Sequence, residues 1–442
     1  MPASRYKILM KELFLLSIPT VLEQIMSTLL QYVDTAMVGR LGERATAAVS
    51  TTTTVTWLTG CVPFAVATAS LALISRENGA GHRDQVRLLT GQTVTLSLIS
   101  GLLVSLLCMA LSPFIPVWMN AEEAVRGPAT EYFFIVNLAG VFKCAGIAFG
   151  SVIRSVKDTR TPMRINLVGN LMNLMLNYFF IYTLAMGVRG AAIATAISYT
   201  AIGILMFIAM RKKEDLCFAR RDLVLKKDLC RSFADIGLPS MATGAASCLG
   251  YVFFAGLVSG MGTTTFAAHS IAVTAEQLFY IPGYGFRTAT STLIGNALGE
   301  GDNEKMIITE RLSIAITTSA MFLSGLVLFF IARPLMGIFT PSEAVVELGA
   351  AMLRIVAFTE PLYGLMIVLE GIFYGYGRTR NIFFIETGSM WGIRILFTFL
   401  VAKVWHLSLA AVWLCMIADN ICKALLLLVD YLRMVRARRA EA

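Results

Sequence analysis

The chain has 442 residues, of which 57% are hydrophobic and only 15% are charged, and its mean hydropathy is +0.71. A soluble domain cannot bury that much apolar surface, so this composition excludes the soluble globular classes. The formal net charge of +9 would suit a nucleic-acid partner, but basic residues sorted by membrane topology explain it without one. The eight cysteines are scattered and form no C-x-x-C pair, which favours neither a metal site nor a disulfide framework.

Apolar stretches of about 18 residues or more recur along the chain, and each can cross a hydrocarbon layer of about 30 Å. They predict an all-α membrane protein of twelve transmembrane helices: 13–38, 46–75, 91–115, 128–153, 162–185, 190–210, 232–260, 264–294, 310–333, 345–373, 382–404 and 408–432. Several stretches exceed about 20 residues, so kinked, tilted or projecting helices are expected. No small-residue cleavage site follows Lys7 and Lys11, which predicts that the first helix is retained.

Lys and Arg are distributed unevenly among the predicted loops. With the N-terminus inside, about 26 of the 37 basic residues fall on the cytoplasmic side, about 6 fall outside and about 5 lie within helices. This predicts a multi-pass protein with both termini in the cytoplasm. The long polar segment 211–231 is interpreted as a cytoplasmic linker between an N-lobe, 1–210, and a C-lobe with a basic tail, 232–442.

The two halves of the chain form an internal repeat. A shift of 220 residues places Pro19 on Pro239 and Gly42 on Gly262. Further pairs in the same register are Gly79 with Gly299, Gly81 with Gly301 and Thr159 with Thr379. Each repeat holds six helices, an even number, so the two repeats are parallel. Parallel repeats are typical of transporters in which two lobes rock around a central site; duplication of a scaffold without transport is the alternative.

Asp34 is the most prominent polar residue predicted within the membrane, because no Lys or Arg among the preceding 20 residues can neutralise it. A polar stripe marks the fifth helix, where spacings of 4, 3 and 4 put four amides on one face: Asn166, Asn170, Asn173 and Asn177. Asn166 is interpreted as an interhelical amide contact. Asp34, Asn177 and Thr195 share the outer half of the membrane, so they are expected to meet.

Four stretches of this frame carry a family resemblance: LSIPTVLEQIMSTLLQYVDTAMVGRLG from Leu16, MNLMLNYFFIY from Met172, GAAIATAI from Gly190 and EGIFYGYGRTR from Glu370. In order and spacing they resemble the multidrug and toxic compound extrusion (MATE) family of the MOP superfamily. The resemblance implies that the N-lobe cation site consists of Asp34, Asn173, Asn177 and Thr195. Some relatives have Asp where this chain has Asn177, so the ion does not carry over. Oxygen ligands suit Na⁺ and an apolar site that favours the protonated carboxyl suits H⁺; both readings stay open.

The predicted C-lobe carries different acids: Glu276, Glu360, Glu370 and Glu386. NorM-like relatives often carry a Glu in the seventh helix, whereas Leu238–Gly260 has no acid, which puts a cation site of that kind in doubt here. Glu276 and Glu360 fall near the membrane midplane and are interpreted as substrate-binding, with a wall formed by Tyr280, Met241 and Tyr363. Glu386 is interpreted as a structural partner of Arg394 or Arg378.

These features predict a cation-coupled antiporter that exports organic, mainly cationic, compounds such as drugs across the plasma membrane by alternating access. The expected partners are small organic substrates and membrane lipids, without nucleic acid, and the protein is expected to act as a monomer. No cofactor is expected beyond the transported H⁺ or Na⁺. An enzyme is disfavoured because the three histidines do not converge with other catalytic groups. A channel and a flippase for lipid-linked substrates are the alternatives, of which the flippase is the stronger.

Overall fold

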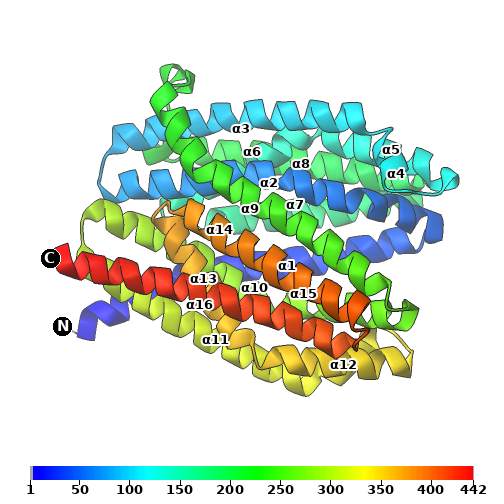
Figure 1. Ribbon diagram of the computed structural model, residues 1–442. Helices are drawn as coiled ribbons and strands as arrows, with labels where there is room; N and C mark the ends of the chain where they lie inside the picture. Colours follow the sequence, from blue (N-terminus) through cyan, green and yellow to red (C-terminus); the bar gives the residue numbers. More distant parts are fainter. Residues whose placement is uncertain (1–2, 442) are drawn as a thin grey trace. The chain divides into compact units, whose positions relative to one another are not determined.

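The computed structural model describes residues 3–441, which are helical almost throughout and contain no β-strand (Figure 1). The helices are α1 (Ala3–Gly39), α2 (Glu43–Gly79), α3 (Arg83–Leu111), α4 (Ile115–Trp118), α5 (Glu123–Leu138), α6 (Gly140–Ser155), α7 (Arg160–Asn177), α8 (Gly187–Arg211), α9 (Lys227–Ser259), α10 (Thr263–Glu300), α11 (Asn303–Phe339), α12 (Glu343–Ala357), α13 (Glu360–Gly375), α14 (Thr379–Ser389), α15 (Leu396–Phe399) and α16 (Leu409–Glu441). Three π-helical segments extend α7, α14 and α15: Tyr178–Thr183, Met390–Ile395 and Leu400–Val404. Two 3₁₀ turns, Glu214–Leu216 and Arg220–Leu223, lie between α8 and α9.

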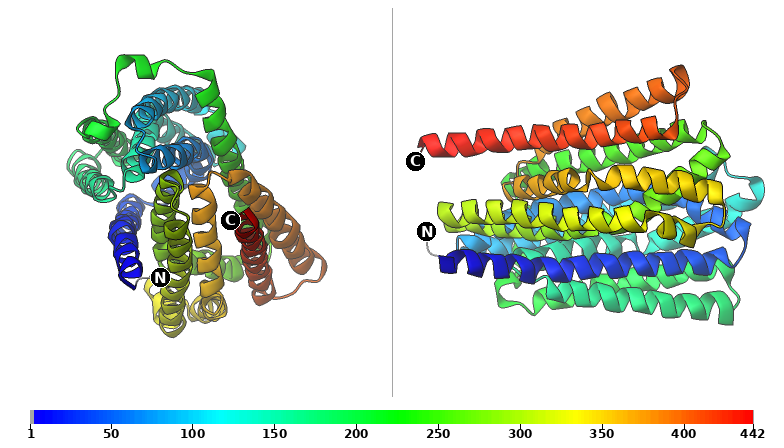
Figure 2. Two further views of the ribbon diagram at one scale, coloured as in Figure 1. Left: turned by 90° about the vertical axis from the view of Figure 1, so that its left-hand side faces the viewer. Right: turned by 90° about the horizontal axis from the view of Figure 1, so that it is seen from below.

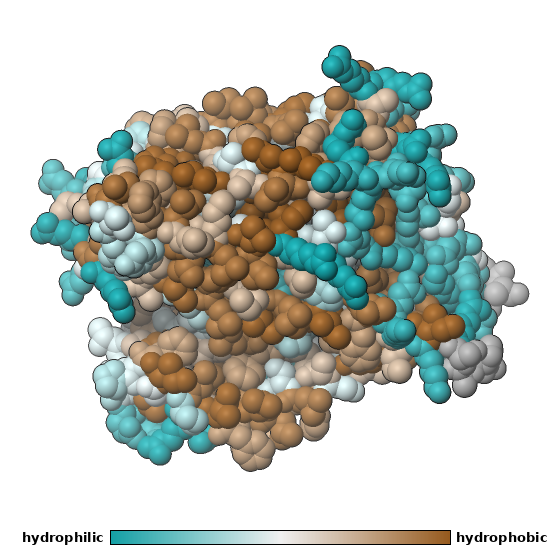
Figure 3. All heavy atoms as spheres, turned by 180° about the vertical axis from the view of Figure 1, so that it is seen from behind, coloured by the Kyte–Doolittle hydropathy of each residue, from teal (hydrophilic) through white to brown (hydrophobic). Residues whose placement is uncertain are grey.

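Twelve helical runs in residues 3–441 match the twelve predicted spans. Eight are single helices long and apolar enough to cross a membrane, and two more are bent pairs that pass the same test together. The other two runs, Arg160–Thr183 and Thr263–Glu300, carry the polar residues on which the site prediction rests, and these lower their mean hydropathy. Many large apolar side chains stay exposed, among them Leu103 and Phe330 at 63% and 70%. On the face drawn in Figure 3, hydrophobic residues dominate the middle and hydrophilic residues gather toward the edges, which suits a lipid environment.

The internal repeat is visible in the backbone of the two halves. α5 and α6 are bent by 49° at Ala139, and α12 and α13 by 58° at the corresponding break before Glu360. Positive φ angles recur in register: Gly42 and Gly262 at 103° and 112°, Gly81 and Gly301 at 72° and 67°, and Lys157 and Gly377 at 63° and 72°. The first π-helical segment also has a counterpart, Leu400–Val404. The duplication predicted from small and turn residues is therefore confirmed as two copies of one six-helix arrangement.

The chain forms two compact units. The N unit comprises Leu22–Met241 and Gly295–Asp302, and the C unit comprises the residues up to Val21, Ala242–Ile294 and the residues from Asn303 onwards. Three long helices, α1, α9 and α10, are divided between the units. Within each unit the helices run lengthwise beside one another (Figure 2). The predicted lobes, 1–210 and 232–442, were each defined as one continuous stretch of the chain, whereas each compact unit combines separate stretches. The lobe limits stay a prediction.

In the N unit, α2, α3, α6 and α8 pack around a core that includes Phe149, Met206 and the linker residue Leu216. A Cβ on Gly79 would lie 1.9 Å from the carbonyl oxygen of Asn296, and a Cβ on Gly299 would lie 1.8 Å from that of Arg76. Only glycine permits this close approach. The two glycines are repeat equivalents, so the same small residue serves the same contact twice.

The predicted linker is docked against the N unit and is not a free chain. The buried amide of Gln92 on α3 donates to the carbonyls of Asp222 and Val224 at 2.7 Å each. Its oxygen accepts the backbone N–H of Lys226 at 3.0 Å. Three hydrogen bonds from one buried side chain fix the course of the segment between α8 and α9.

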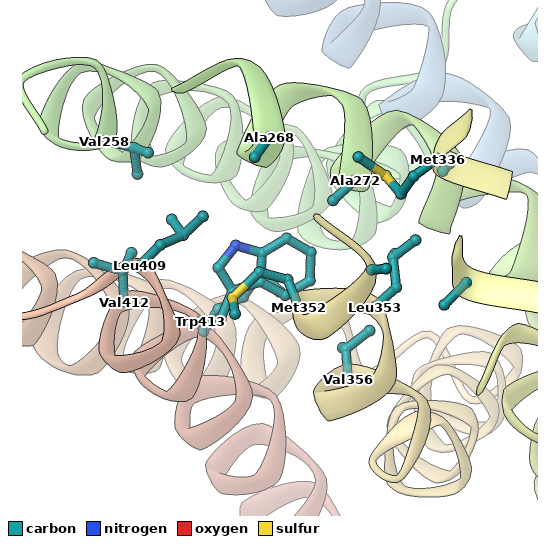
Figure 4. Packing of buried hydrophobic residues seen from close by; sticks show 14 of the residues in the cluster. Val258, Ala268, Ala272, Met336, Met352, Leu353, Val356, Leu409, Val412 and Trp413 are labelled. Atoms are coloured by element: carbon teal, nitrogen blue, oxygen red, sulfur yellow. The ribbon is translucent and has the colours of Figure 1, made fainter. Parts of the chain in front are cut away.

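The largest core cluster of the C unit surrounds Trp413, which is fully buried. Figure 4 shows its ring among Val258, Leu409 and Met352, which come from α9, α16 and α12. Small residues such as Ala268 and Ala272 let α10 approach this cluster closely. The packing holds α10, which carries Glu276, against α9, α12 and α16.

Candidate ion and substrate sites

The four residues of the predicted cation site are joined by hydrogen bonds within the N unit. The amide nitrogen of Asn177 donates to Asp34 Oδ1 and to Asn173 Oδ1, the latter at 3.1 Å. Asn173 in turn donates to Thr195 Oγ1 at 3.4 Å. These residues form the Asp34 cluster, which lies toward the C-terminal ends of α1 and α7 and near the start of α8.

One atom of the cluster lacks a partner. Asn177 is fully buried, and its Oδ1 accepts no hydrogen bond from any described residue. A buried amide oxygen without a donor is costly unless something else occupies it. With the Asp34 carboxylate, Asn173 Oδ1 and Thr195 Oγ1 it makes a set of hard oxygen atoms suited to a small cation.

The register of α1 and α7 explains why these side chains meet. Asn166 contacts Glu23, Asn170 contacts Ser27, and Asn177 contacts Asp34, always at a sequence separation of 143 residues. A constant separation means that the two helices run parallel, side by side. The amide stripe recognised from its helical spacing therefore faces the polar face of α1 along its length.

A cavity of about 370 Å³ opens beside the Asp34 cluster. Asp34, Asn173 and Thr195 line it, and the fully buried Asn177 lies behind Asp34. Most of the remaining lining residues carry hydroxyl or amide groups: Ser27, Gln31, Thr35, Thr52, Thr53, Thr56, Tyr132, Asn170, Ser198 and Tyr199. The threonines of α2 and the two tyrosines were not predicted as site residues. The run of threonines at 51–54 and 56, unusual for a membrane span, was the signal that could have revealed them.

Glu23 was also missed, although it is a second acid within the first predicted span. Arg154 Nη2 lies 2.7 and 2.9 Å from its two carboxylate oxygens. Asn166 donates to Glu23 Oε1 at 2.6 Å, so the interhelical contact expected of Asn166 is made to a carboxylate.

The C-unit acids Glu276 and Glu360 are both buried, at 8% and 1% exposure. Neither carboxylate oxygen of Glu360 has a hydrogen-bond partner among the described residues. One turn further along each helix lie Tyr280 and Tyr363, whose ring centroids are 5.5 Å apart. Two predicted aromatic residues of the substrate wall are thus neighbours. Met241 is the last residue of the N unit's share of α9 and is not part of the C unit.

The expected pairing of Glu386 with Arg394 is wrong. Arg394 Nε lies 2.8 Å from Asp419 Oδ2, and Arg394 donates to Asn420 Oδ1 at 2.8 Å. Lys423 shares the same carboxylate at 3.0 Å. The prediction paired Arg394 with an acid close to it in the sequence. It failed because the acid that pairs with Arg394 is Asp419 of α16, a later helix.

Glu370 is paired with Arg287 of α10 at 2.8 Å. Arg287 falls within the predicted span 264–294, and no partner was predicted for it. Glu370 is buried and Arg287 is half-buried, and removal of either partner would leave an uncompensated charge. Glu370 thus differs from Glu276 and Glu360 in having a basic partner at hydrogen-bond distance.

The chain is similar to known proteins along most of its length. A family model described as MatE matches residues 19–179 and again residues 239–400, one match in each repeat. The chain is 27% identical over 428 residues to the "Probable multidrug resistance protein NorM" of Thermotoga maritima, covering 96% of this chain and 92% of that protein. It is 24% identical over 403 residues to the "Multidrug resistance protein MdtK" of Yersinia pseudotuberculosis, covering 88% and 86%.

Solved structures share the fold. A Vibrio cholerae MATE transporter superposes with a TM-score of 0.92 at 21% identity and covers 98% of both chains. A MOP superfamily transporter from Pyrococcus furiosus superposes with a TM-score of 0.91 at 21% identity, covering 97% of this chain and 96% of that chain. The duplicated family match over most of the chain and the shared twelve-helix fold agree with the resemblance found in the sequence. The chain belongs to the MatE family of membrane transporters.

Proposed function

We propose that this protein is an antiporter that exports organic compounds, mainly cations such as drugs, across the plasma membrane by alternating access, driven by entry of H⁺ or Na⁺. The observation that carries the proposal is the Asp34 cluster, a half-buried carboxylate with an unpartnered amide oxygen beside a polar cavity. Relatives named as multidrug resistance proteins support the substrate class. The protein acts as a monomer among lipids, with the transported ion as its only cofactor-like component.

The ion binds where negative charge and oxygen ligands converge. Na⁺ would be held by the Asp34 carboxylate, the amide oxygens and Thr195 Oγ1, whereas H⁺ would sit on the carboxyl alone. Either ion removes the net charge of Asp34. Neutralisation changes which arrangement of the surrounding helices is favoured, and this links the ion to the conformational cycle.

The substrate is recognised by the acidic and aromatic groups of the C unit. Glu276 and Glu360 supply negative charge, and the rings of Tyr280 and Tyr363 supply faces that attract organic cations. The nearby basic residue Arg394 already pairs with Asp419. A bound cation would therefore compensate acids that the protein leaves without close basic partners.

Purified wild-type protein in liposomes tests the function directly. We expect an organic cation to move uphill when an opposing H⁺ or Na⁺ gradient is imposed, and imposing the two gradients separately identifies the ion. Passive substrate flux that ignores both gradients would indicate a channel. Movement of a lipid-linked sugar without response to either gradient would indicate a flippase and overturn the proposal.

The proposed topology places both termini and the 211–231 linker in the cytoplasm. In a cysteine-free background, single cysteines at Lys212 and Asn120 should react differently with an impermeant maleimide on intact cells. Asn120, between α4 and α5, should label rapidly, and Lys212, just after α8, should label only after the cells are opened. Rapid labelling of Lys212 on intact cells would reverse the orientation.

A further inference from the structure

Glu23 and Arg154 form an ion pair that lies next to the Asp34 cavity but outside it. Their side chains are only 11% and 15% exposed, and both belong to the N unit. Glu23 also accepts a hydrogen bond from Asn166 at 2.6 Å. A charged residue within a membrane span costs free energy, so we expect the Glu23–Arg154 pair to have a function.

The position of the pair follows from the parallel register of α1 and α7. Ser27 and Asn170, joined at 2.9 Å, line the cavity, and Glu23 and Asn166 lie one helical turn before them. Glu23 and Asp34 are eleven residues apart, or about 16 Å along an α-helix. The pair therefore stands at the end of the cavity opposite to Asp34, the end that the proposed topology turns toward the cytoplasm.

Arg154 is the more weakly held partner. Its Nε has no hydrogen-bond partner among residues 3–441, whereas Glu23 keeps the Asn166 amide if Arg154 leaves. Arg154 occupies the last turn of α6, a short segment separated from α5 by the 49° bend. Gly150, one turn earlier, leaves space for the guanidinium, since a Cβ there would lie 3.2 Å from Arg154 Nη1.

We propose that Glu23 is a second carboxylate on the route of the coupling ion, and that Arg154 closes this route in the state described here. When Arg154 moves away, Glu23 with Ser27 and Asn170 gives an ion released from Asp34 a polar path toward the cytoplasm. Without that carboxylate a cation would cross about 16 Å of protein with no compensating charge. The inference rests on the proposed function, because it assumes that an ion bound at Asp34 drives transport.

Two single variants are expected to change ion movement in different ways. Glu23→Gln keeps the size of the side chain and an acceptor for Asn166, so the protein should fold and bind substrate. The cytoplasmic ion concentration needed for half-maximal exchange should rise about tenfold, while the dependence on external ion stays unchanged. Arg154→Gln removes the closing charge and should allow ion flux without substrate, which a purely structural pair would not produce.

The measurements use inside-out and right-side-out vesicles with H⁺ and Na⁺ tested separately. Glu310→Gln is the matched control, because Glu310 is a buried carboxylate held by Arg438 at 2.9 Å in the C unit. The double variant Glu23→Gln with Arg154→Gln removes both charges and should fold. It should leak less ion than Arg154→Gln, because the route lacks its carboxylate, and it should show the raised cytoplasmic ion requirement of Glu23→Gln. If Glu23→Gln does not fold, Glu23→Asp, which keeps the charge, should retain the normal cytoplasmic ion dependence.

Unchanged ion dependence in Glu23→Gln, or changes equal to those of Glu310→Gln, would overturn the inference. So would a double variant that transports like the wild type without leak, which is the behaviour of a structural ion pair. A wild-type protein that responds to neither gradient would instead refute the proposed function. The two failures are therefore distinguishable in one set of vesicles.

Discussion

Asp34→Asn is expected to abolish export driven by an imposed cation gradient while the protein remains folded and still binds substrate. Asn keeps the size of the side chain and an oxygen that can accept the Asn177 amide. It deletes the charge that attracts the ion. Loss of a charge-assisted contact of about 3 kcal/mol corresponds to about a hundredfold lower ion affinity, which would leave the site empty at ordinary gradients.

Substrate binding should survive in Asp34→Asn because the ion and the substrate are coupled through the conformational states of the protein. Ion and substrate drive each other only because they favour different conformational states, so removal of the ion's site uncouples the two without destroying the substrate site. Thr195→Ala removes one neutral contact worth about 1 kcal/mol and should weaken ion dependence about fivefold. The partial effect of Thr195→Ala and the complete effect of Asp34→Asn should therefore form a series.

The assay is uptake into proteoliposomes under separate H⁺ and Na⁺ gradients, with substrate binding measured on the same preparations. Asp158→Asn is the matched control, since Asp158 is a carboxylate of the same unit that pairs with Lys213 at 2.7 Å, away from the cluster. It should leave coupling intact. Undiminished gradient-driven transport by Asp34→Asn would move the coupling site to the C-unit glutamates.

Sequence patterns predicted the N-unit geometry well where regular spacing was involved. The 4, 3, 4 spacing of the asparagines identified the face of α7, and counting turns from the helix ends brought Asp34 and Asn177 to one depth. Such arguments work because an α-helix has a fixed rise and period. The repeat was predictable for the same kind of reason, since left-handed backbone positions such as Gly42 and Gly262 tolerate few residues other than glycine.

Partner choice between distant helices was not predictable. Arg154 directly follows the predicted span 128–153, yet its side chain pairs with Glu23 of the first span. Arg394 was matched with an acid eight residues away, although Asp419 of α16 is its partner. Such pairs depend on how helices pack, and packing leaves no periodic trace in one sequence. The bends at Ala139 and before Glu360 were equally hidden, because no proline stands at the break itself in the first copy.

Glu276→Gln is expected to weaken binding of cationic substrates by about tenfold to a hundredfold while leaving neutral compounds little affected. Glu276 is buried in the C unit. The positive charge of Arg394 acts on it, but Arg394 is already paired with Asp419. A cationic ligand would supply the compensating charge, and such a charge-assisted contact contributes about 1.5–3 kcal/mol. A neutral ligand gains nothing from the charge and should lose little.

The comparison needs a pair of substrates of the same shape, one cationic and one uncharged, with affinities measured on purified protein by tryptophan fluorescence or calorimetry. Glu276→Asp keeps the charge and should retain most of the preference for the cation. Glu370→Gln serves as the contrasting variant, because its carboxylate already pairs with Arg287, so its removal should cost stability without changing the preference between the two ligands. If Glu276→Gln weakens both ligands equally, or if Glu276→Asp shows no preference for the cation, the carboxylate only supports the fold. Glu360, whose oxygens have no partner among the described residues, would then be the remaining acid to recognise the cation.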